Sequence, residues 1–101
     1  MTYWIEIAGN EFNAPLLFAP IPAPDWAFSG RPETAGIFQN NHDIITGPCN
    51  SLYSGPLFIS IRDDEQRVVP FMQLNNNIYN LGPGTFLRFD PGNLQVSVDV
   101  T

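Results

Sequence analysis

Prolines and glycines recur along the whole chain, and they constrain its fold more than any other feature. The 101 residues include ten prolines and eight glycines. Proline breaks a helix interior and glycine weakens it, so a helical bundle is excluded. Apolar residues make up 44% of the chain and aromatic residues 13%, which is a globular composition and not a disordered one. We therefore expect residues 1–101 to form one domain without helices.

Alternation of apolar and polar residues predicts strands, most clearly in the second half of the chain. Residues 94–100 alternate from end to end, so their apolar members should face the core, namely Leu94, Val96, Val98 and Val100. Residues 56–62 place Leu57, Ile59 and Ile61 on one face. Further strands are expected at 2–8, at 67–72 (with Pro70 marking an edge or a bulge), at 78–79 and at 85–89, and turns at 63–66, 75–77, 82–84 and 90–93. This spacing predicts a single antiparallel β-sandwich of the jelly-roll or galactose-binding-like type.

The N-terminal half looks richer in loops. Residues 29–54 are punctuated by glycine, proline, asparagine and serine, and we expect a loop there that contains at most a brief strand at 43–46. Surface loops on a rigid sheet framework usually carry recognition, so this loop is the expected site of specificity.

Residues 12–28 combine large apolar side chains with four prolines. The prolines predict an extended, polyproline-like segment without strand pairing. Its apolar side chains must be covered, either by the domain's own sheet or by a neighbouring molecule. In the second case the partner-binding residues are Phe12, Leu16, Leu17, Phe18, Ile21 and Trp26.

Charge and length exclude several classes of function. Ten acidic residues stand against four arginines and no lysine, giving a formal charge of −6. Nucleic-acid binding needs a basic surface, so it is not expected, whereas an acidic surface suits docking on a basic partner. The sequence contains no stretch of 18 apolar residues, so no membrane-spanning helix is predicted. The N-terminus lacks the pattern of a secretory signal, so we expect the protein in the cytoplasm or in an assembled particle such as a virion.

The inventory of reactive side chains does not predict an enzyme. The single histidine, His42, and the single cysteine, Cys49, lie seven residues apart in the expected loop, with no orienting third group evident. Asp63-Asp64-Glu65 is expected to be a solvated turn. Asp90-Pro91-Gly92-Asn93 offers two oxygen ligands where calcium prefers six to eight, so a β-turn is favoured there. Trp26 suits stacking on a sugar ring, although burial in a core is favoured.

Several runs in the second half resemble a known family. They are residues 55–61, Val69-Pro70-Phe71-Met72, residues 75–79, residues 84–90 and residues 93–98. In this order they resemble the bacterial calcium-dependent galactophilic lectins (PA-IL-like), which are galactose-binding-like β-sandwiches. The resemblance implies a calcium-bridged sugar site, with Asp90 as the acidic ligand and Asn93 as the terminal amide ligand. The remaining calcium ligands of the family have no counterpart here, and Phe89 stands where an asparagine is expected.

Two hypotheses from different classes follow. The favoured one is a non-catalytic structural protein, a phage virion component such as a capsid decoration or a tail module. It docks on protein partners, in a homo-oligomer or a larger assembly, through the Pro-rich segment 12–28 and the last strand. The alternative is a lectin-like module whose sugar or calcium site comprises His42, Asp43, Asp90 and Asn93. No cofactor other than that calcium is expected.

Overall fold

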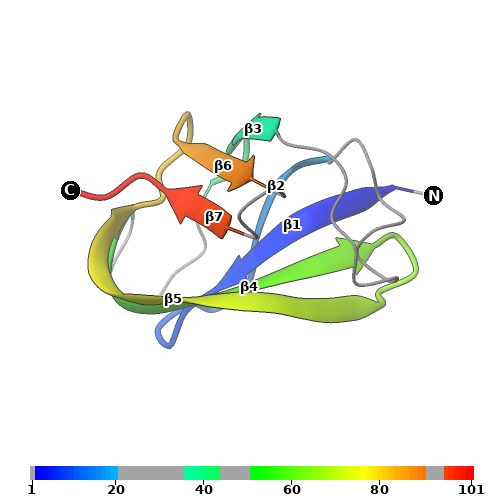
Figure 1. Ribbon diagram of the computed structural model, residues 1–101, viewed down its shortest axis with the longest axis horizontal. Coiled ribbons are helices and arrows are strands. Elements are labelled where there is room, and N and C mark those ends of the chain that lie inside the picture. Colours follow the sequence, from blue (N-terminus) through cyan, green and yellow to red (C-terminus); the bar gives the residue numbers. More distant parts are fainter. Residues whose placement is uncertain (1, 21–35, 44–50, 91–94) are drawn as a thin grey trace.

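The computed structural model describes residues 2–20, 36–43, 51–90 and 95–101. Strands are the regular elements of these residues, and no helix occurs among them (Figure 1). The strands are β1 (Tyr3–Ala8), β2 (Leu16–Pro20), β3 (Gly36–Gln39), β4 (Leu52–Asp63), β5 (Val68–Asn80), β6 (Phe86–Asp90) and β7 (Gln95–Val98).

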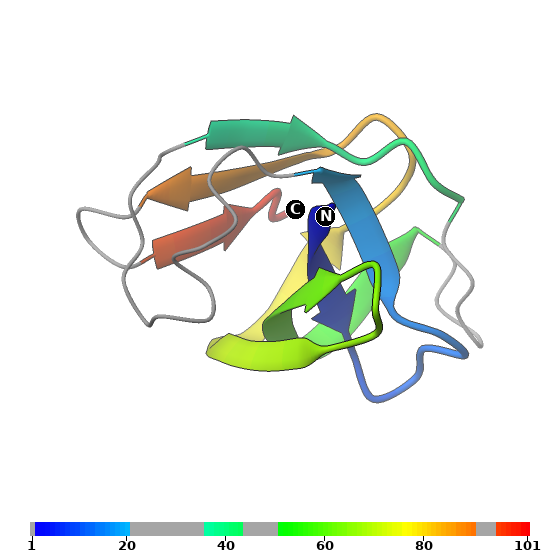
Figure 2. The ribbon, with the colours of Figure 1, turned by 90° about the vertical axis from the view of Figure 1, so that its right-hand side faces the viewer.

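The strands form two sheets. One has the order β2-β1-β4-β5 and the other the order β3-β6-β7. Every neighbouring pair is antiparallel. Figure 2 shows β3, β6 and β7 along one side of the molecule and β1, β4 and β5 along the other. The all-β prediction is confirmed at this level, as two antiparallel sheets.

Both sheets contribute to one hydrophobic core. Because successive side chains of a strand point to opposite faces, every second residue is buried. The fully buried members include Ile5 and Ile7 of β1, Leu57, Ile59 and Ile61 of β4, and Leu87 and Phe89 of β6. Burial of each such side chain stabilises the fold by roughly 1.5–3 kcal/mol relative to exposure.

The predicted strand of residues 56–62 and the role of Pro70 are confirmed. Leu57, Ile59 and Ile61 are buried, as their alternation predicts. β5 is the edge strand of its sheet. Ile59 pairs with Met72 and Ser60 with Pro70, which leaves one extra residue on β5 and forms a bulge. Pro70 thus lies on an edge strand and at a bulge, two places where its missing N–H is tolerated.

Two predictions for the second half are wrong. Residues 75–77 are not a turn, because β5 runs through them opposite the long strand β4, with Leu57 paired to Leu74 and Gly55 to Asn77. Pairing with β4 overrides the poor strand propensity of asparagine. Val100 does not face the core, because β7 ends at Val98 and Val100 forms only an isolated bridge to Tyr79, leaving it 55% exposed. Leu94 lies outside the described residues.

The predicted loop of residues 29–54 is also partly wrong. It contains β3, which pairs with β6, and its end belongs to β4. The four residues of β3 are too few to show alternation, so only pairing with β6 identifies them as a strand. Asp43, the first residue of the predicted strand 43–46, lies outside any strand, and residues 44–46 are outside the described part.

Residues 16–20 of the Pro-rich segment do pair, contrary to the prediction, and residues 21–28 lie outside the described residues. β2 is the edge strand beside β1, with Leu16 opposite Ile7 and Pro20 opposite Trp4. Proline at the boundary of an edge strand interrupts little of the hydrogen-bond ladder, which explains why pairing is tolerated here.

Candidate binding surfaces

Four of the apolar residues predicted to bind a partner are described, and these four do not share one surface. Leu16 and Phe18 are 4% and 0% exposed, so the chain itself covers them. Phe12 is half-buried and meets the ring of Tyr53 edge-on, with 5.0 Å between ring centroids. Leu17 is half-buried on the opposite face of β2 from Leu16. Ile21 and Trp26 lie outside the described residues.

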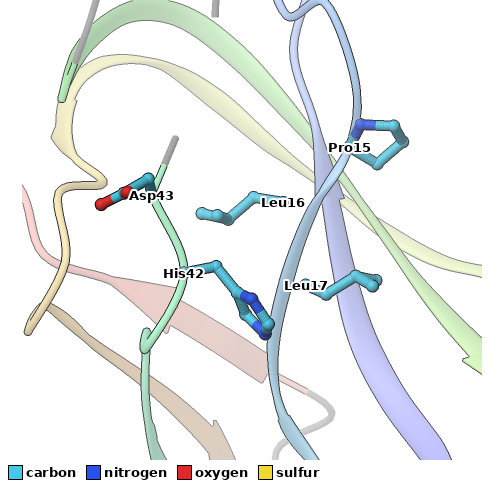
Figure 3. A pocket seen from close by; sticks show the side chains of 5 residues that line it. All are labelled: Pro15, Leu16, Leu17, His42 and Asp43. Carbon is cyan, nitrogen blue, oxygen red and sulfur yellow. The ribbon is translucent and has the colours of Figure 1, made fainter. Parts of the chain in front are cut away.

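A pocket forms where β2 approaches the segment after β3. It has a volume of about 440 Å³ and is lined by Pro15, Leu16, Leu17, His42 and Asp43. Figure 3 shows His42 and Asp43 on one segment, and Pro15, Leu16 and Leu17 on the segment across from it. The pocket therefore combines one apolar wall with one wall that carries an imidazole and a carboxylate.

Asn40 fixes the polar wall of this pocket. Its side chain is fully buried, donates from Nδ2 to the carbonyl oxygens of Leu81 (2.9 Å) and Gly82 (3.2 Å), and accepts from the His42 N–H through Oδ1 (2.9 Å). Its backbone N–H donates to the Thr85 carbonyl at 2.8 Å. Residues 40–43 are thus tied to the turn before β6. Sequence reasoning missed Asn40, because its partners are about forty residues away.

The pocket does not include Asp90. Gly36 pairs with Phe89 and Gln39 with Phe86, so Asp90 lies at the end of the β3–β6 pair opposite to His42 and Asp43. The four residue steps from Phe86 to Asp90 alone span roughly 13 Å, whereas the ligands of one calcium ion lie within about 2.6 Å of it. Asn93 lies outside the described residues. Among the residues that are described, no group of three or more histidine, cysteine, aspartate or glutamate side chains is arranged to hold a metal ion.

A second surface is the solvent-facing side of the sheet β3-β6-β7, which we call the outer β6 face. Its exposed side chains are Ile37, Gln39, Phe86, Arg88, Gln95, Ser97 and Asp99. Sequence reasoning did not identify this surface. Its signal in the sequence is that large apolar residues occupy some of the outward-facing strand positions.

Pairing arranges most of the outer β6 face in two rows, and Gln95 pairs with Asp90 beyond them. One row is Ile37–Arg88–Ser97, set by direct register across the three strands. The other joins Gln39 to Phe86 and places Asp99 beside Phe86, whose N–H donates to Asp99 Oδ2 at 3.3 Å. Ile37 is 63% exposed and Phe86 49% exposed. The two rows enclose a shallow hollow of about 210 Å³.

Arg88 carries an available charge on this face. Arg62 lies over the ring of Trp4, 5.9 Å from its centroid, and Arg67 pairs with Asp63 through an Nε–Oδ2 contact of 2.6 Å. Within the described ranges, Arg88 forms no salt bridge and its side chain is exposed. An exposed arginine next to large apolar side chains such as Ile37 and Phe86 is typical of the centre of a protein–protein contact.

The other sheet also exposes large apolar side chains, namely Leu52, Phe58, Val68 and Ile78 of β4 and β5, but its charged side chains Glu6 and Arg62 are half-buried. Among the residues that the structure describes, Glu6 Oε2 and Arg62 Nε are buried and have no hydrogen-bond partner. Burial raises the pKa of Glu6, and the charge of Arg62 opposes this shift. Charges that are already half covered in this way are less suited to meeting a partner than Arg88 is.

Comparison with known proteins gives no relative. No protein-family model matches the sequence, and no match is found among curated proteins or solved structures. The resemblance to galactophilic lectins stays a prediction. Within the described residues, the structure has no helix that is both long and apolar enough to cross a membrane.

Proposed function

We propose that this chain is a non-catalytic structural protein that docks on protein partners through the outer β6 face. The observation that carries the proposal is the exposure of Ile37 and Phe86 around Arg88 on a regular, strand-supported surface. Covering each of these two side chains with a partner contributes roughly 1.5–3 kcal/mol to association. The rigid sheet holds them in place, so little conformational entropy is lost on docking.

The finer architecture belongs to the same proposal. We take the two sheets to form a β-sandwich of the jelly-roll or galactose-binding-like type, because residues of both sheets meet in one core. A sandwich supplies the stiff platform on which a flat docking face is useful.

The setting we propose is a virion, in which the protein serves as a capsid decoration or a tail module, after synthesis in a cytoplasm. The support comes from the sequence: a charge of −6 with no lysine, in a chain whose reactive residues do not resemble those of an enzyme. Lysine is depleted from protein interfaces, and an acidic surface favours basic partners.

Site-specific photo-crosslinking tests the docking face. A photoreactive phenylalanine analogue is placed at Phe86 and, as the matched control, at Ile78, because both side chains are 49% exposed. In the cells or particles that produce the protein, position 86 should form one covalent adduct of defined mass, and position 78 should form none. Mass spectrometry then identifies the partner. Absence of any adduct at position 86, or equal adducts at both positions, contradicts the proposal.

A carbohydrate-binding role is the second candidate, favoured by the pocket at His42 and Asp43. Pro15, Leu16 and Leu17 are the apolar lining of the pocket, and His42 and Asp43 supply an imidazole and a carboxylate that can hydrogen-bond to sugar hydroxyl groups. A glycan array followed by calorimetry, with and without calcium, tests this role. Binding should be lost in Asp43→Asn and retained in Asp90→Asn, and absence of binding to any glycan removes the candidate.

A further inference from the structure

The outer β6 face carries a cation, although the whole chain is strongly acidic. The protein has a formal charge of −6. On the outer β6 face, Arg88 lines the same hollow as the carboxylate of Asp99, and the half-buried Asp90 follows two residues later on the same side of β6. Two copies of an acidic protein repel each other over most of their surfaces. Arg88 offers an opposite charge to a carboxylate of a second copy, and this attraction offsets part of the repulsion.

Four side chains at the centre of the face are arranged so that a two-fold axis can relate two copies; they are Phe86, Arg88, Ser97 and Asp99. Arg88 and Ser97 are paired across β6 and β7, and Phe86 and Asp99 are joined by a hydrogen bond one row away. Arg88 and Asp99 therefore occupy one diagonal of a four-residue square, while Phe86 and Ser97 occupy the other. A two-fold axis in the plane of the face, along the Phe86–Ser97 diagonal, exchanges the positions of Arg88 and Asp99.

We propose that the partner of the outer β6 face is a second copy of this chain, related by this two-fold axis. This inference rests on the proposed function and names its partner. Arg88 of each copy then contacts Asp99 of the other, so the contact is self-complementary, as a two-fold interface requires. Phe86 packs against Phe86 of the second copy on the axis. The strands of the two copies cross at a large angle, as in orthogonal sheet packing.

The size of the face sets the expected strength. Three strands spaced about 4.8 Å apart, each showing four to five residues at about 3.3 Å per residue, present a few hundred Å². A stable interface buries about 800 Å² on each partner. The isolated protein should therefore be in equilibrium between monomer and dimer, with a dissociation constant in the micromolar range or weaker.

A charge exchange tests the proposal. Dimerisation is measured by analytical ultracentrifugation at about 0.15 M salt, where the Debye length of about 8 Å screens repulsion beyond the contact. Arg88→Asp and Asp99→Arg should each weaken dimerisation by about tenfold or more, because each places like charges opposite one another. The double variant carrying both changes should recover the wild-type dissociation constant to within about threefold. As a control, Ile78→Asp changes an apolar residue that is as exposed as Phe86, and it should leave the dissociation constant unchanged.

Each outcome bears on the inference in a defined way. Recovery in the double variant supports the two-fold contact. A wild-type protein that remains monomeric at millimolar concentration overturns the inference, and so does a dimer that none of the charge variants alters. Circular dichroism confirms that each variant folds. The crosslink at position 86 separates the two proposals. An adduct with a different protein rules out dimerisation through this face but supports the docking function. The absence of any adduct rules out both proposals.

Discussion

Asn40 shows how one polar side chain can organise a site from within the core. Its amide donates to two carbonyl oxygens of the turn before β6, and its Oδ1 accepts from the backbone of His42. A buried polar group is stabilising only when it is hydrogen-bonded, and here the side chain has a partner for both of its polar atoms. The position of the pocket wall at His42 and Asp43 therefore depends on a residue that does not line the pocket.

Replacing Asn40 with alanine should destabilise the protein strongly. The variant leaves the buried carbonyl group of Leu81 without the Asn40 donor, and an unmet buried group costs about 1–3 kcal/mol. It also removes one of three donors to the Gly82 carbonyl, which accepts from the N–H and the Oγ1 of Thr85 as well. We expect the free energy of unfolding, measured by urea denaturation, to fall by about 3 kcal/mol. Asn41→Ala changes a neighbouring asparagine that is exposed, and it should alter stability by less than about 0.5 kcal/mol. Equal effects of the two changes would contradict this role for Asn40.

Burial could be predicted for residues that follow the alternation of apolar and polar side chains, but it could not be predicted for the buried polar residues. The inward positions of Leu57, Ile59 and Ile61 follow from alternation alone. Asn40 and Asp63 are both fully buried, against the usual preference of their side chains. Their burial depends on hydrogen bonds that exist only after the strands have paired, so no local pattern reveals it.

The turn between β4 and β5 is the clearest case at the scale of an element. The sequence Asp63-Asp64-Glu65 suggested a solvated turn, and the turn is present, but Asp63 is buried in it. Its carboxylate accepts from the N–H groups of Glu65 and Arg67, each at 2.9 Å, and from Arg67 Nε at 2.6 Å. Asp63 thus joins the end of β4 to the start of β5. The hydrogen-bonded carboxylate closes the hairpin and is not a spare ligand for a cation.

Acid should weaken this turn. Desolvation acts to raise the pKa of Asp63, but the hydrogen bonds from Arg67 and Glu65 outweigh it, and the pKa lies below its ordinary value of 3.8. A carboxyl whose pKa is lowered by folding stabilises the protein above its unfolded pKa. That contribution is lost as the pH falls below about 3.8, through the lowered pKa of the folded state.

The test is the free energy of unfolding of wild type and Asp63→Asn between pH 2 and pH 7. Wild type should lose stability as the pH drops from about 4 towards 2, and Asp63→Asn should be less stable at pH 7 and show a shallower loss. Asp64→Asn keeps all three hydrogen bonds to Asp63 and should retain the wild-type slope. An unchanged slope in Asp63→Asn would show that its carboxylate does not control the acid sensitivity.

The two short edge strands β2 and β3 were the elements that sequence reasoning missed. β2 was expected to be extended but unpaired because of its prolines, yet it pairs with β1 at the edge of the sheet. β3 is too short to show a period and becomes a strand by pairing with β6. In both cases the deciding interaction is a partner strand distant in sequence. Long strands with a buried face, such as β4, carry their own signal and were predictable.

At the scale of the whole molecule, the sequence predicted a fold class and the structure redirected the search for a contact surface. The Pro-rich segment was the expected docking element, but its Leu16 and Phe18 belong to the core. The outer β6 face has exposed apolar side chains and an arginine on a regular surface instead. This face is assembled from three strands, of which β3 was not predicted, so the sequence alone could not define it.

If the outer β6 face docks on a partner, it is covered in the native assembly. Carbene footprinting with mass spectrometry measures this by comparing the labelling of each side chain in the isolated protein and in the assembly. We expect labelling of Ile37 and Phe86 to fall on assembly, while labelling of Leu52 and Ile78, at 49% exposure each, stays the same. Unchanged labelling of Ile37 and Phe86, with protection at Leu52 or Ile78, would contradict it.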